Sequence, residues 1–484
     1  MNRLFYIAMI LLLGACSFPH VQKHTANALS NPFLTSHSYT LETVPKDTRT
    51  MIFAAAAIKD LKKLQFDWLK MNAEMTKDLY PGYSMVTIDG PNQDNRKISL
   101  RITNTVDQAQ SSLYFTFIPF KGKNKETYCD PNALPNGNGS KERPYRSLQS
   151  LMESGYEPIS NEVIYLLNGN HGTANLHGGH YTIAAASGHA AVLNAIHITN
   201  GKNILVHSIR IESRMPVNSY LLTIDTLSEE IIIQNCKITC TVSDDELHQK
   251  NWKEYVASGI YCEGNKCRIH GNLIQYTFHG LQTNGNQNII SNNIIDRFCG
   301  DAIRNTGNDN QFLKNFLSNA LIDDYYDPTG NHDDLLQAWT HDSPILNIII
   351  KKNIAISTTD PDLPNRSKIV QGLVCFDGFT ENWVVDSNIV VTDHPHGISL
   401  YGAKHCTIKN NIVLRNPHKF YDFESDPWIM IHDHKDKRMS EHNKVISNVA
   451  TKYNIPSTST IIKDNITIDS IYLTNFIKYH GWIY

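Results

Sequence analysis

Asp301-Ala-Ile-Arg-Asn305 and Asp334-Leu-Leu-Gln-Ala338 are two of six copies of a short phrase that recurs between residues 258 and 401. Each copy has a polar first residue, a second residue that is usually small, and an apolar third residue. Sequence repeats of this kind are typical of stacked architectures in which every repeat forms one layer. The phrase therefore predicts a solenoid. The other copies are Ser258-Gly-Ile-Tyr-Cys262, His279-Gly-Leu-Gln-Thr283, Gln371-Gly-Leu-Val-Cys375 and His396-Gly-Ile-Ser-Leu400.

A second repeat places an Asn before apolar residues, from Asn235 to Asn448, at intervals of 37, 21, 22, 38, 35, 23 and 37 residues. Asn tolerates left-handed backbone at turns, so these residues are expected to form a ladder from coil to coil. The short intervals define the minimal coil, and the long ones require inserted loops. Solenoid insertions tend to project from one face, which is often the binding face. The predicted loops are 241–258, 323–344, 357–370 and 417–442.

Alignment of the six phrases predicts columns of side chains that lie about 4.8 Å apart along the stack. The third and fifth residues are expected to point inward, because they are mostly apolar or small. The first, fourth and sixth residues are expected to point outward. The first column is rich in ionisable groups and changes at every coil, which favours a functional site over a uniform structural stack. Its members are Ser258, His279, Asp301, Asp334, Gln371 and His396.

The composition describes an ordinary folded protein: 484 residues, 41% hydrophobic content and a formal net charge of -3. No basic block favours nucleic acid as a partner, so that class is excluded, and a monomer is expected. Eight Cys follow Cys16, and those at inward phrase positions are expected to be buried thiols. One bridge near Cys262 and Cys267 is the alternative.

The N-terminus has the pattern of an export signal. Asn2-Arg3 precedes the apolar run 4–13, which is too short for a spanning helix, and Leu13-Gly-Ala-Cys16 resembles a bacterial lipobox. The resemblance implies lipidation of Cys16 and, with Ser17 after it, an outer-membrane lipoprotein of a Gram-negative bacterium, anchored without spanning the bilayer. An ordinary signal peptide with an incidental Cys is the alternative.

The expected organisation has five parts: a signal peptide at 1–16, a tether at 17–48, a small α+β unit at 49–125, a solenoid at 126–455 and a C-terminal cap at 456–484. Within the α+β unit, apolar spacing between residues 50 and 77 predicts a helix. Alternating residues near Ser84, Lys97 and Leu113 then predict strands.

Several blocks resemble secreted proteins of the pectate-lyase-like superfamily, which are right-handed parallel β-helices. The Gly/Asn-rich turn before Pro144-Tyr-Arg-Ser-Leu-Gln149 and a short capping helix over 147–153 match the opening of such coils. Gly300-Asp-Ala-Ile-Arg304 and His332-Asp-Asp-Leu-Leu-Gln-Ala-Trp339 match two of their blocks, except that Ala302 and Leu335 replace Gly. The resemblance covers roughly residues 128 to 450, and it implies an all-β right-handed parallel β-helix near the polysaccharide lyases.

Neighbouring Asp301 and Asp334 would repel each other, so either a cation lies between them or one pKa is raised. One interpretation is a Ca²⁺ site with hard oxygen ligands from Asp301, Asp334 and Asp324. The other is paired acid/base chemistry on a glycosidic bond. A polar stack without catalysis is the third possibility.

The leading function is a polysaccharide lyase that cleaves a uronate-containing polysaccharide by β-elimination. Arg304 or Ca²⁺ would neutralise the substrate carboxylate, His332, His396 or Lys435 would act as the base, and Tyr401 as the acid. The alternatives are an inverting hydrolase of polygalacturonase type, with Asp301 and Asp333 or Asp334 and Asp377, and a non-catalytic carbohydrate-binding surface protein. The candidate catalytic residues are Asp301, Arg304, His332, Asp333, Asp334, His396, Tyr401 and Lys435. The candidate substrate-binding residues are His279, Gln282, Gln337, Trp339, Phe376, Asp377, Trp428 and His432.

Overall fold

The structure is a computed structural model that describes most of residues 33–467. The gaps fall at 35–37, 45–46, 58–61, 63, 70–76, 81, 90–96, 106–107, 109, 120–124, 244–245, 247–255, 323–332, 341–342, 361, 364–369, 417–425 and 457–458. The expected lipobox with Cys16 and the candidates Asp324 and His332 lie outside the described residues. No helix in the described part of the chain is long and apolar enough to cross a membrane.

The phrase strands form a continuous parallel sheet, as the repeat predicts. Each pairs with the next in the expected register, so that Ile260, Leu281, Ile303, Leu336, Leu373 and Ile398 are successive partners. The alignment of the six copies is therefore confirmed. The strands are β19 (Ser258–Cys262), β22 (Leu281–Thr283), β25 (Ile303–Asn305), β28 (Asp334–Ala338), β32 (Gln371–Cys375) and β36 (His396–Tyr401).

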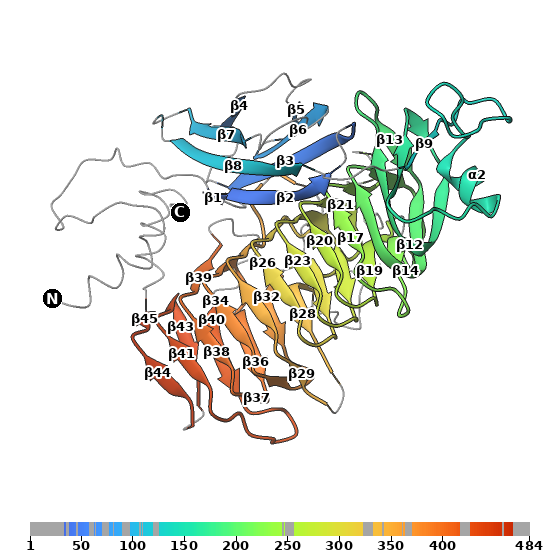
Figure 1. The fold of residues 1–484 in the computed structure, drawn as a ribbon. Coiled ribbons are helices and arrows are strands. Elements are labelled where there is room, and N and C mark those ends of the chain that lie inside the picture. The colour runs from blue at the N-terminus through green and yellow to red at the C-terminus, as the bar shows by residue number, and fades with distance from the viewer. Residues whose placement is uncertain are drawn as a thin grey trace.

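Two further parallel series complete each coil of a right-handed parallel β-helix (Figure 1). The first series runs from β17 (Ile232–Gln234) to β44 (Ile461–Lys463). The strands between them are β20 (Arg268–His270), β23 (Ile289–Ser291), β26 (Gln311–Leu313), β30 (Ile349–Lys351), β34 (Val384–Asp386), β38 (Thr407–Lys409) and β41 (Lys444–Ile446). The other is a twelve-stranded sheet from β11 (Gly169–Asn170) to β45 (Ile466–Thr467). Parallel strands linked by crossovers adopt the right-handed connection almost without exception. The coils continue to Thr467, past the expected boundary at residue 455.

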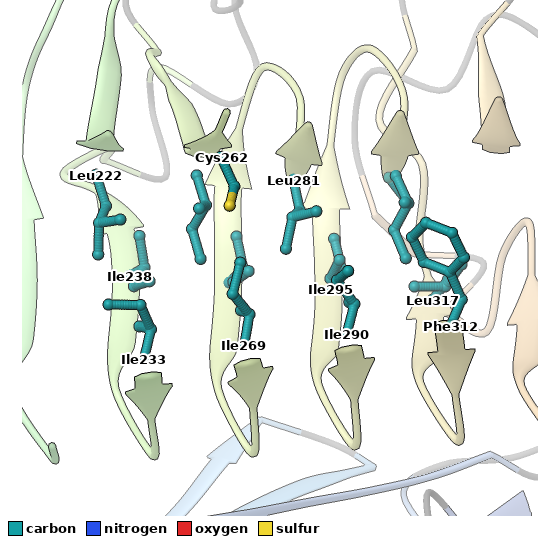
Figure 2. Close-up of a cluster of buried hydrophobic side chains, with 14 of the residues drawn as sticks. Leu222, Ile233, Ile238, Cys262, Ile269, Leu281, Ile290, Ile295, Phe312 and Leu317 are labelled. Carbon is teal, nitrogen blue, oxygen red and sulfur yellow. The ribbon is translucent and has the colours of Figure 1, made fainter. Parts of the chain in front are cut away.

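The interior of the solenoid is a set of apolar columns (Figure 2). Leu222, Ile260 and Leu281 follow one another in the phrase sheet, while Ile233, Ile269, Ile290 and Phe312 do so in the second series. All of these side chains are fully buried. The eight described cysteines are buried and none of them forms a disulfide, so the alternative of a Cys262–Cys267 bridge is not seen.

The expected asparagine ladder is present, with one correction about its backbone. Each ladder Asn after Asn272 accepts from the backbone N–H and side chain of the preceding one, as Asn353 does from Asn315 at 2.9 and 3.0 Å. The left-handed residue is the one before the ladder Asn, for example Lys352 at φ 57°, and Asn235 belongs to that left-handed column. Residues with φ near +55° turn the chain at each coil, and the Asn side chain then satisfies the turn amides. The ladder runs through Asn272, Asn293, Asn315, Asn353, Asn388, Asn411, Asn448 and Asn465.

The N-terminal end of the solenoid is closed by helix α2 (Leu148–Glu153), as expected. Ser147 caps it by accepting from the Ser150 N–H at 3.1 Å. Leu148, Leu151 and Met152 are buried in the solenoid core. The helix therefore covers the first coil with its apolar face.

The N-terminal unit consists of two small sheets in the described residues, so the expected helix between residues 50 and 77 is wrong. That segment forms β3 (Arg49–Ala57) and β4 (Leu64–Leu69). The run Met51–Ala57 is apolar at consecutive positions because β3 is buried on both faces, which periodicity does not distinguish from a buried helix. The other strands are β1 (Phe33–Leu34), β2 (Ser38–Val44), β5 (Lys77–Tyr80), β6 (Tyr83–Asp89), β7 (Lys97–Asn104) and β8 (Gln110–Pro119).

The two faces of β3 explain how this unit is held. Ile52, Ala54 and Ala56 pack between its two sheets, whereas Met51 and Phe53 pack on the twelve-stranded sheet of the solenoid. The unit lies along that sheet (blue in Figure 1), away from the phrase strands. It covers an outer apolar face of the solenoid and leaves the phrase sheet open to other contacts.

Candidate functional site

The first residues of the phrases form a hydrogen-bonded chain along the stack. The Ser258 hydroxyl accepts the N–H of His279 at 3.3 Å, and His279 Nδ1 accepts the N–H of Asp301 at 2.9 Å. Asp301 Oδ1 in turn accepts the N–H of Asp334 at 2.8 Å. Each of these side chains thus accepts a hydrogen bond from the backbone N–H of the first phrase residue in the next coil. This arrangement accounts for the burial of these side chains, although an open outward column was expected.

The first and fourth residues of a phrase nevertheless share a face. Arg304 Nε lies 2.9 Å from Asp301 Oδ2, and Gln337 Nε2 donates to Asp334 Oδ2 at 2.8 Å. Both pairs are three residues apart and lie on the side away from the apolar core. The predicted grouping of Asp301, Arg304, Asp334 and Gln337 is present in the structure.

Arg304 is the centre of this group. Beyond Asp301, its guanidinium lies 2.9 Å from His279 Nε2 and 3.4 Å from Gln337 Oε1. Its Cζ lies 4.5 Å from the centre of the Trp339 ring, which is a cation–π contact. About a quarter of the side chain is exposed, 24%, whereas Asp301 is buried. Arg304 is therefore a partly solvent-exposed cation whose position is fixed by Asp301, His279 and Trp339.

His279 is neutral in this group. Burial, and next the Arg304 charge, lower its pKa well below the ordinary value. The lone pair of its Nδ1 already accepts the Asp301 N–H. For this reason we treat the 3.6 Å contact between His279 and Asp301 as packing of neutral imidazole, not as an ion pair.

Burial raises the pKa of both carboxyl groups in the pair. The pKa of Asp301 is raised to about 7 by burial, although Arg304 lowers it in part. The pKa of Asp334 is raised well above its ordinary value, first by burial and then by the charges of Asp301 and Asp333. Asp333 is buried too. Asp301 and Asp334 thus share one guanidinium, which favours protonation of one of them near neutral pH.

The described residues do not by themselves fit the expected calcium site. Asp301 has one oxygen on the Asp334 N–H and the other on Arg304, so little of its carboxylate is left for a metal. Only Asp334 Oδ1 and Gln371 Oε1 are buried here without a hydrogen-bond donor. No group of three His, Cys, Asp or Glu with metal-binding geometry occurs among the described residues. We derive no step through a metal ion.

A second cluster of aromatic and histidine side chains lies further along the same sheet. The Phe376 ring lies 4.5 Å from that of His396 and 5.3 Å from that of Tyr401. Trp428, on β40 (Trp428–His432), donates from Nε1 to His396 Nδ1 at 3.1 Å. The His432 ring lies 5.8 Å from Tyr401. We call these five residues the aromatic cluster.

The structure separates the aromatic cluster from Arg304. β25 carries Arg304 and β36 carries His396 and Tyr401, with β28 and β32 between them. Three strand spacings amount to about 14 Å. His396 and Tyr401 are therefore too far away to act on the same bond as Arg304.

Asp377 and Lys435 form an exposed ion pair at 2.5 Å, beyond the end of β32. Gln371, at the start of β32, is the neighbour of Asp334. From Gln371 to the end of β32 the chain extends about 13 Å, and Asp377 lies beyond that end. The structure thus does not bring Asp377 together with Asp334, nor Lys435 together with Arg304.

On the other side of Arg304, the predicted binding residue Gln282 belongs to a polar group whose members Tyr220 and Tyr261 were not among the predicted site residues. Tyr220, on β16 (Tyr220–Ile224), stacks on Tyr261 with ring centres 4.8 Å apart. The Tyr220 hydroxyl donates to Gln282 Oε1 at 3.2 Å, and Asn284 Nδ2 donates to the Tyr261 hydroxyl at 2.9 Å. Tyr261 is the fourth residue of a phrase and could have been found. Tyr220 belongs to a strand whose sequence, Tyr-Leu-Leu-Thr-Ile, lacks the small second residue.

The solved structures that resemble this chain are parallel β-helix proteins, and the similarity of each to this chain is low. They include the pectate lyase Pel9A, with a TM-score of 0.42 and 15% identity over 72% of this chain and 80% of that one. DFA-IIIase from Arthrobacter chlorophenolicus A6 has a TM-score of 0.32 and 12% identity, over 72% and 99% of the two chains. Alginate lyase from Paenibacillus sp. str. FPU-7 has a TM-score of 0.26 and 13% identity, over 65% and 94%.

No family model and no curated protein matches the sequence. At such low TM-scores and identities the structural likenesses carry no argument about the reaction. The parallel β-helix itself is established by the strand register of the chain.

Proposed function

We propose that this protein is a carbohydrate-active β-helix protein that binds an acidic polysaccharide along the phrase sheet and cleaves it by β-elimination. The observation that carries the proposal is Arg304, a partly exposed guanidinium buttressed by Asp301 and Trp339 at the middle of this surface. Arginine suits bidentate recognition of a carboxylate, and uronates carry one on every sugar.

The surroundings of Arg304 support a chain-like ligand. The Tyr220–Tyr261 stack lies on one side and the aromatic cluster on the other. From β16 to β40 the phrase sheet spans seven strand spacings, about 34 Å. Aromatic faces and side-chain amides at intervals along such a strip fit a series of sugar rings.

β-Elimination requires three events at one uronate. A cation neutralises the carboxylate, which makes the C5 proton more acidic; a base removes that proton; and the C4–oxygen bond breaks as the leaving oxygen takes up a proton. Arg304 fits the first role. His332 is our proposed base, because it stands two residues before Asp334 in the sequence. His396, Tyr401 and Lys435 are more distant and fit binding roles.

The test is incubation of the purified protein with pectate and with alginate, followed by ultraviolet absorbance of the unsaturated uronate product. New reducing ends without that absorbance would favour the hydrolase instead, and binding without either would favour the non-catalytic surface protein. Absence of binding to both polymers would contradict the proposal.

The matched variants are Arg304→Lys and Lys444→Gln. Lysine keeps the positive charge but lacks the paired N–H donors with which a guanidinium binds both oxygens of a carboxylate. We therefore expect a fall in activity of at least tenfold for Arg304→Lys. Lys444 is an exposed residue of β41 (Lys444–Ile446), outside the phrase sheet, and its substitution should leave activity unchanged. Equal activity of the two variants would remove Arg304 from the site.

Calcium dependence and membrane anchoring are also part of the proposal. Chelation with EDTA should abolish activity if Asp324, together with the free oxygens of Asp334 and Gln371, binds Ca²⁺.

Labelled palmitate should be incorporated into the full chain in an outer-membrane fraction, and this labelling should be lost in Cys16→Ser. An unlabelled wild-type chain would contradict the lipid anchor.

A further inference from the structure

The tautomer of His279 is fixed by its surroundings. Its Nδ1 accepts the backbone N–H of Asp301 at 2.9 Å. Because an amide N–H is always a donor, Nδ1 carries no proton, and the single proton of the neutral ring lies on Nε2. The same contact excludes an imidazolium, which has a proton on both nitrogens. His279 Nε2 is therefore a hydrogen-bond donor.

The orientation of the His279 ring is fixed as well. The Phe278 ring packs edge-on against it, with ring centres 4.5 Å apart and an interplanar angle of 74°. A Cβ at Gly300 would lie 2.6 Å from both Nδ1 and Cε1 of the imidazole, so glycine at this position leaves room for the ring. His279 is only 7% exposed. Its Nε2–H is thus held in one direction.

That direction leads to a second donor. Arg304 Nη1 lies 2.9 Å from His279 Nε2, and a guanidinium has donors but no acceptor. Neither atom can accept from the other. The guanidinium is kept against the imidazole by Asp301 Oδ2, which lies 2.9 Å from its Nε, and by the Trp339 ring. Two donors therefore converge here without a shared acceptor, an arrangement that costs free energy until an acceptor is supplied.

We propose that the carboxylate of the ligand binds at this contact, with one oxygen accepting from Arg304 Nη1 and the other from His279 Nε2–H. A carboxylate presents two acceptor oxygens side by side, and donors oriented in advance stabilise it without reorganisation. Since His279 is more buried than Arg304, the guanidinium moves away from the imidazole as the oxygen enters. The inference rests on the proposed function, because it takes the ligand to be a uronate.

The proposal also assigns His279 a role in binding and not in proton abstraction. Its Nε2 already carries a proton, and its Nδ1 lone pair is used by the Asp301 N–H. Neither nitrogen is free to accept the C5 proton of a uronate.

Nuclear magnetic resonance of the free protein tests the tautomer. In protein with isotopically labelled histidine, long-range nitrogen–proton correlations distinguish protonated from unprotonated ring nitrogens, and His279→Gln assigns the signal. A protonated Nε2 with an unprotonated Nδ1 supports the proposal, whereas an Nδ1–H tautomer or an imidazolium overturns it. Trigalacturonate or trimannuronate should then shift the Nε2–H signal, and neutral galactotriose should not. An Nε2–H signal that does not move when either uronate binds would overturn the proposal.

Two variants separate the binding role from a structural one. Asparagine keeps an acceptor near the Nδ1 position but has no donor near Nε2, whereas glutamine keeps an N–H near Nε2 without the acceptor. We expect His279→Asn to weaken uronate binding at least tenfold, because a hydrogen bond to a charged group is lost. His279→Gln should stay within about threefold of wild type. Equal affinities of the two variants, or a weaker glutamine variant, would show that only acceptance of the Asp301 N–H matters and would overturn the proposal.

The matched control is His405→Asn, which should bind like wild type. His405 is exposed and lies between β37 (Ala403–Lys404) and β38, outside the phrase sheet. Isothermal titration calorimetry with trigalacturonate and trimannuronate measures all affinities. A wild type that binds a uronate no better than His279→Asn does would overturn this inference alone and leave the proposed function standing. A wild type that binds neither trisaccharide would overturn both.

Discussion

At the scale of single residues, buried amide side chains carry much of this fold. Asn353 is typical: its Nδ2 donates to the Phe312 carbonyl at 2.8 Å and to Asn388 Oδ1 at 2.9 Å, while its Oδ1 accepts from Asn315. Every polar atom of the side chain is therefore used. Because a buried donor or acceptor that loses its partner keeps its full desolvation cost, the ladder depends on each member.

We expect Asn353→Ala to lower the free energy of unfolding by about 2–4 kcal/mol, because it leaves the Asn315 N–H without its acceptor and removes a donor from the Phe312 carbonyl in the interior. Urea unfolding followed by circular dichroism measures the change. Asn132→Ala, in an exposed turn, is the control and should change stability by less than about 0.5 kcal/mol. Similar values for the two variants would show that the ladder contributes little.

At the scale of elements, the N-terminal unit is fastened to the solenoid by a buried tyrosine. The Tyr83 hydroxyl, at the start of β6, donates to Asp296 Oδ1 at 2.7 Å and lies 2.6 Å from the Ser318 hydroxyl. Burial raises the pKa of this hydroxyl well above its ordinary value, so it stays protonated. The contact joins residues more than two hundred positions apart in the chain.

Tyr83→Phe should keep the packing and lose only the hydroxyl. We expect it to destabilise the protein by about 1–3 kcal/mol, since the Asp296 carboxylate loses a buried donor. Limited proteolysis of the variant and the wild type, with cleavage in the N-terminal unit followed by mass spectrometry, measures loosening of that unit. Tyr114→Phe is the matched control, because Tyr114 is 53% exposed. Equal cleavage rates in the two variants would argue against a fastening role for Tyr83.

At the scale of the whole molecule, we expect two buried histidines to couple the stability of the folded protein to pH, one of them in contact with the N-terminal unit. His207 Nε2 lies 3.1 Å from the Thr50 hydroxyl of β3, and Gln234 links His207 to His270. Burial, and next the charge of His270, lower the pKa of His207 to about 3. Burial, and next Arg268, lower the pKa of His270 to about 4. Both side chains are therefore neutral in the folded protein.

The ordinary histidine pKa is about 6.5, so below that pH the unfolded chain binds more protons than the folded one. Stability is fully present above about pH 6.5 and is lost as the pH falls toward 3. At pH 5 the loss amounts to about 2 kcal/mol for each histidine. Urea midpoints at pH 7 and pH 5 measure it. His207→Gln should reduce the difference between the two pH values, and His177→Gln, at a partly exposed site, should not; an unchanged difference in His207→Gln would refute the coupling.

The sequence by itself determined the solenoid, because each coil of a stacked fold corresponds to one local sequence repeat. The phrase fixed the register of Ile260 through Ile398, and the Asn repeat fixed the ladder. The same reasoning failed at β3, where Met51–Ala57 is apolar at every position because two separate cores lie on its two faces. Periodicity records one buried face, so a strand buried on both sides resembles part of a buried helix.

What only the tertiary structure decided is which side chains of the column are buried. The phrase placed Arg304, His396 and Tyr401 on one face, and the order of its copies implied the three strand spacings that the structure has between them. The phrase could not show that Asp301 and Asp334 are buried, since the contacts of their coils with one another are made between repeats. A local repeat carries the interactions within one coil, whereas a site on a solenoid is made between coils.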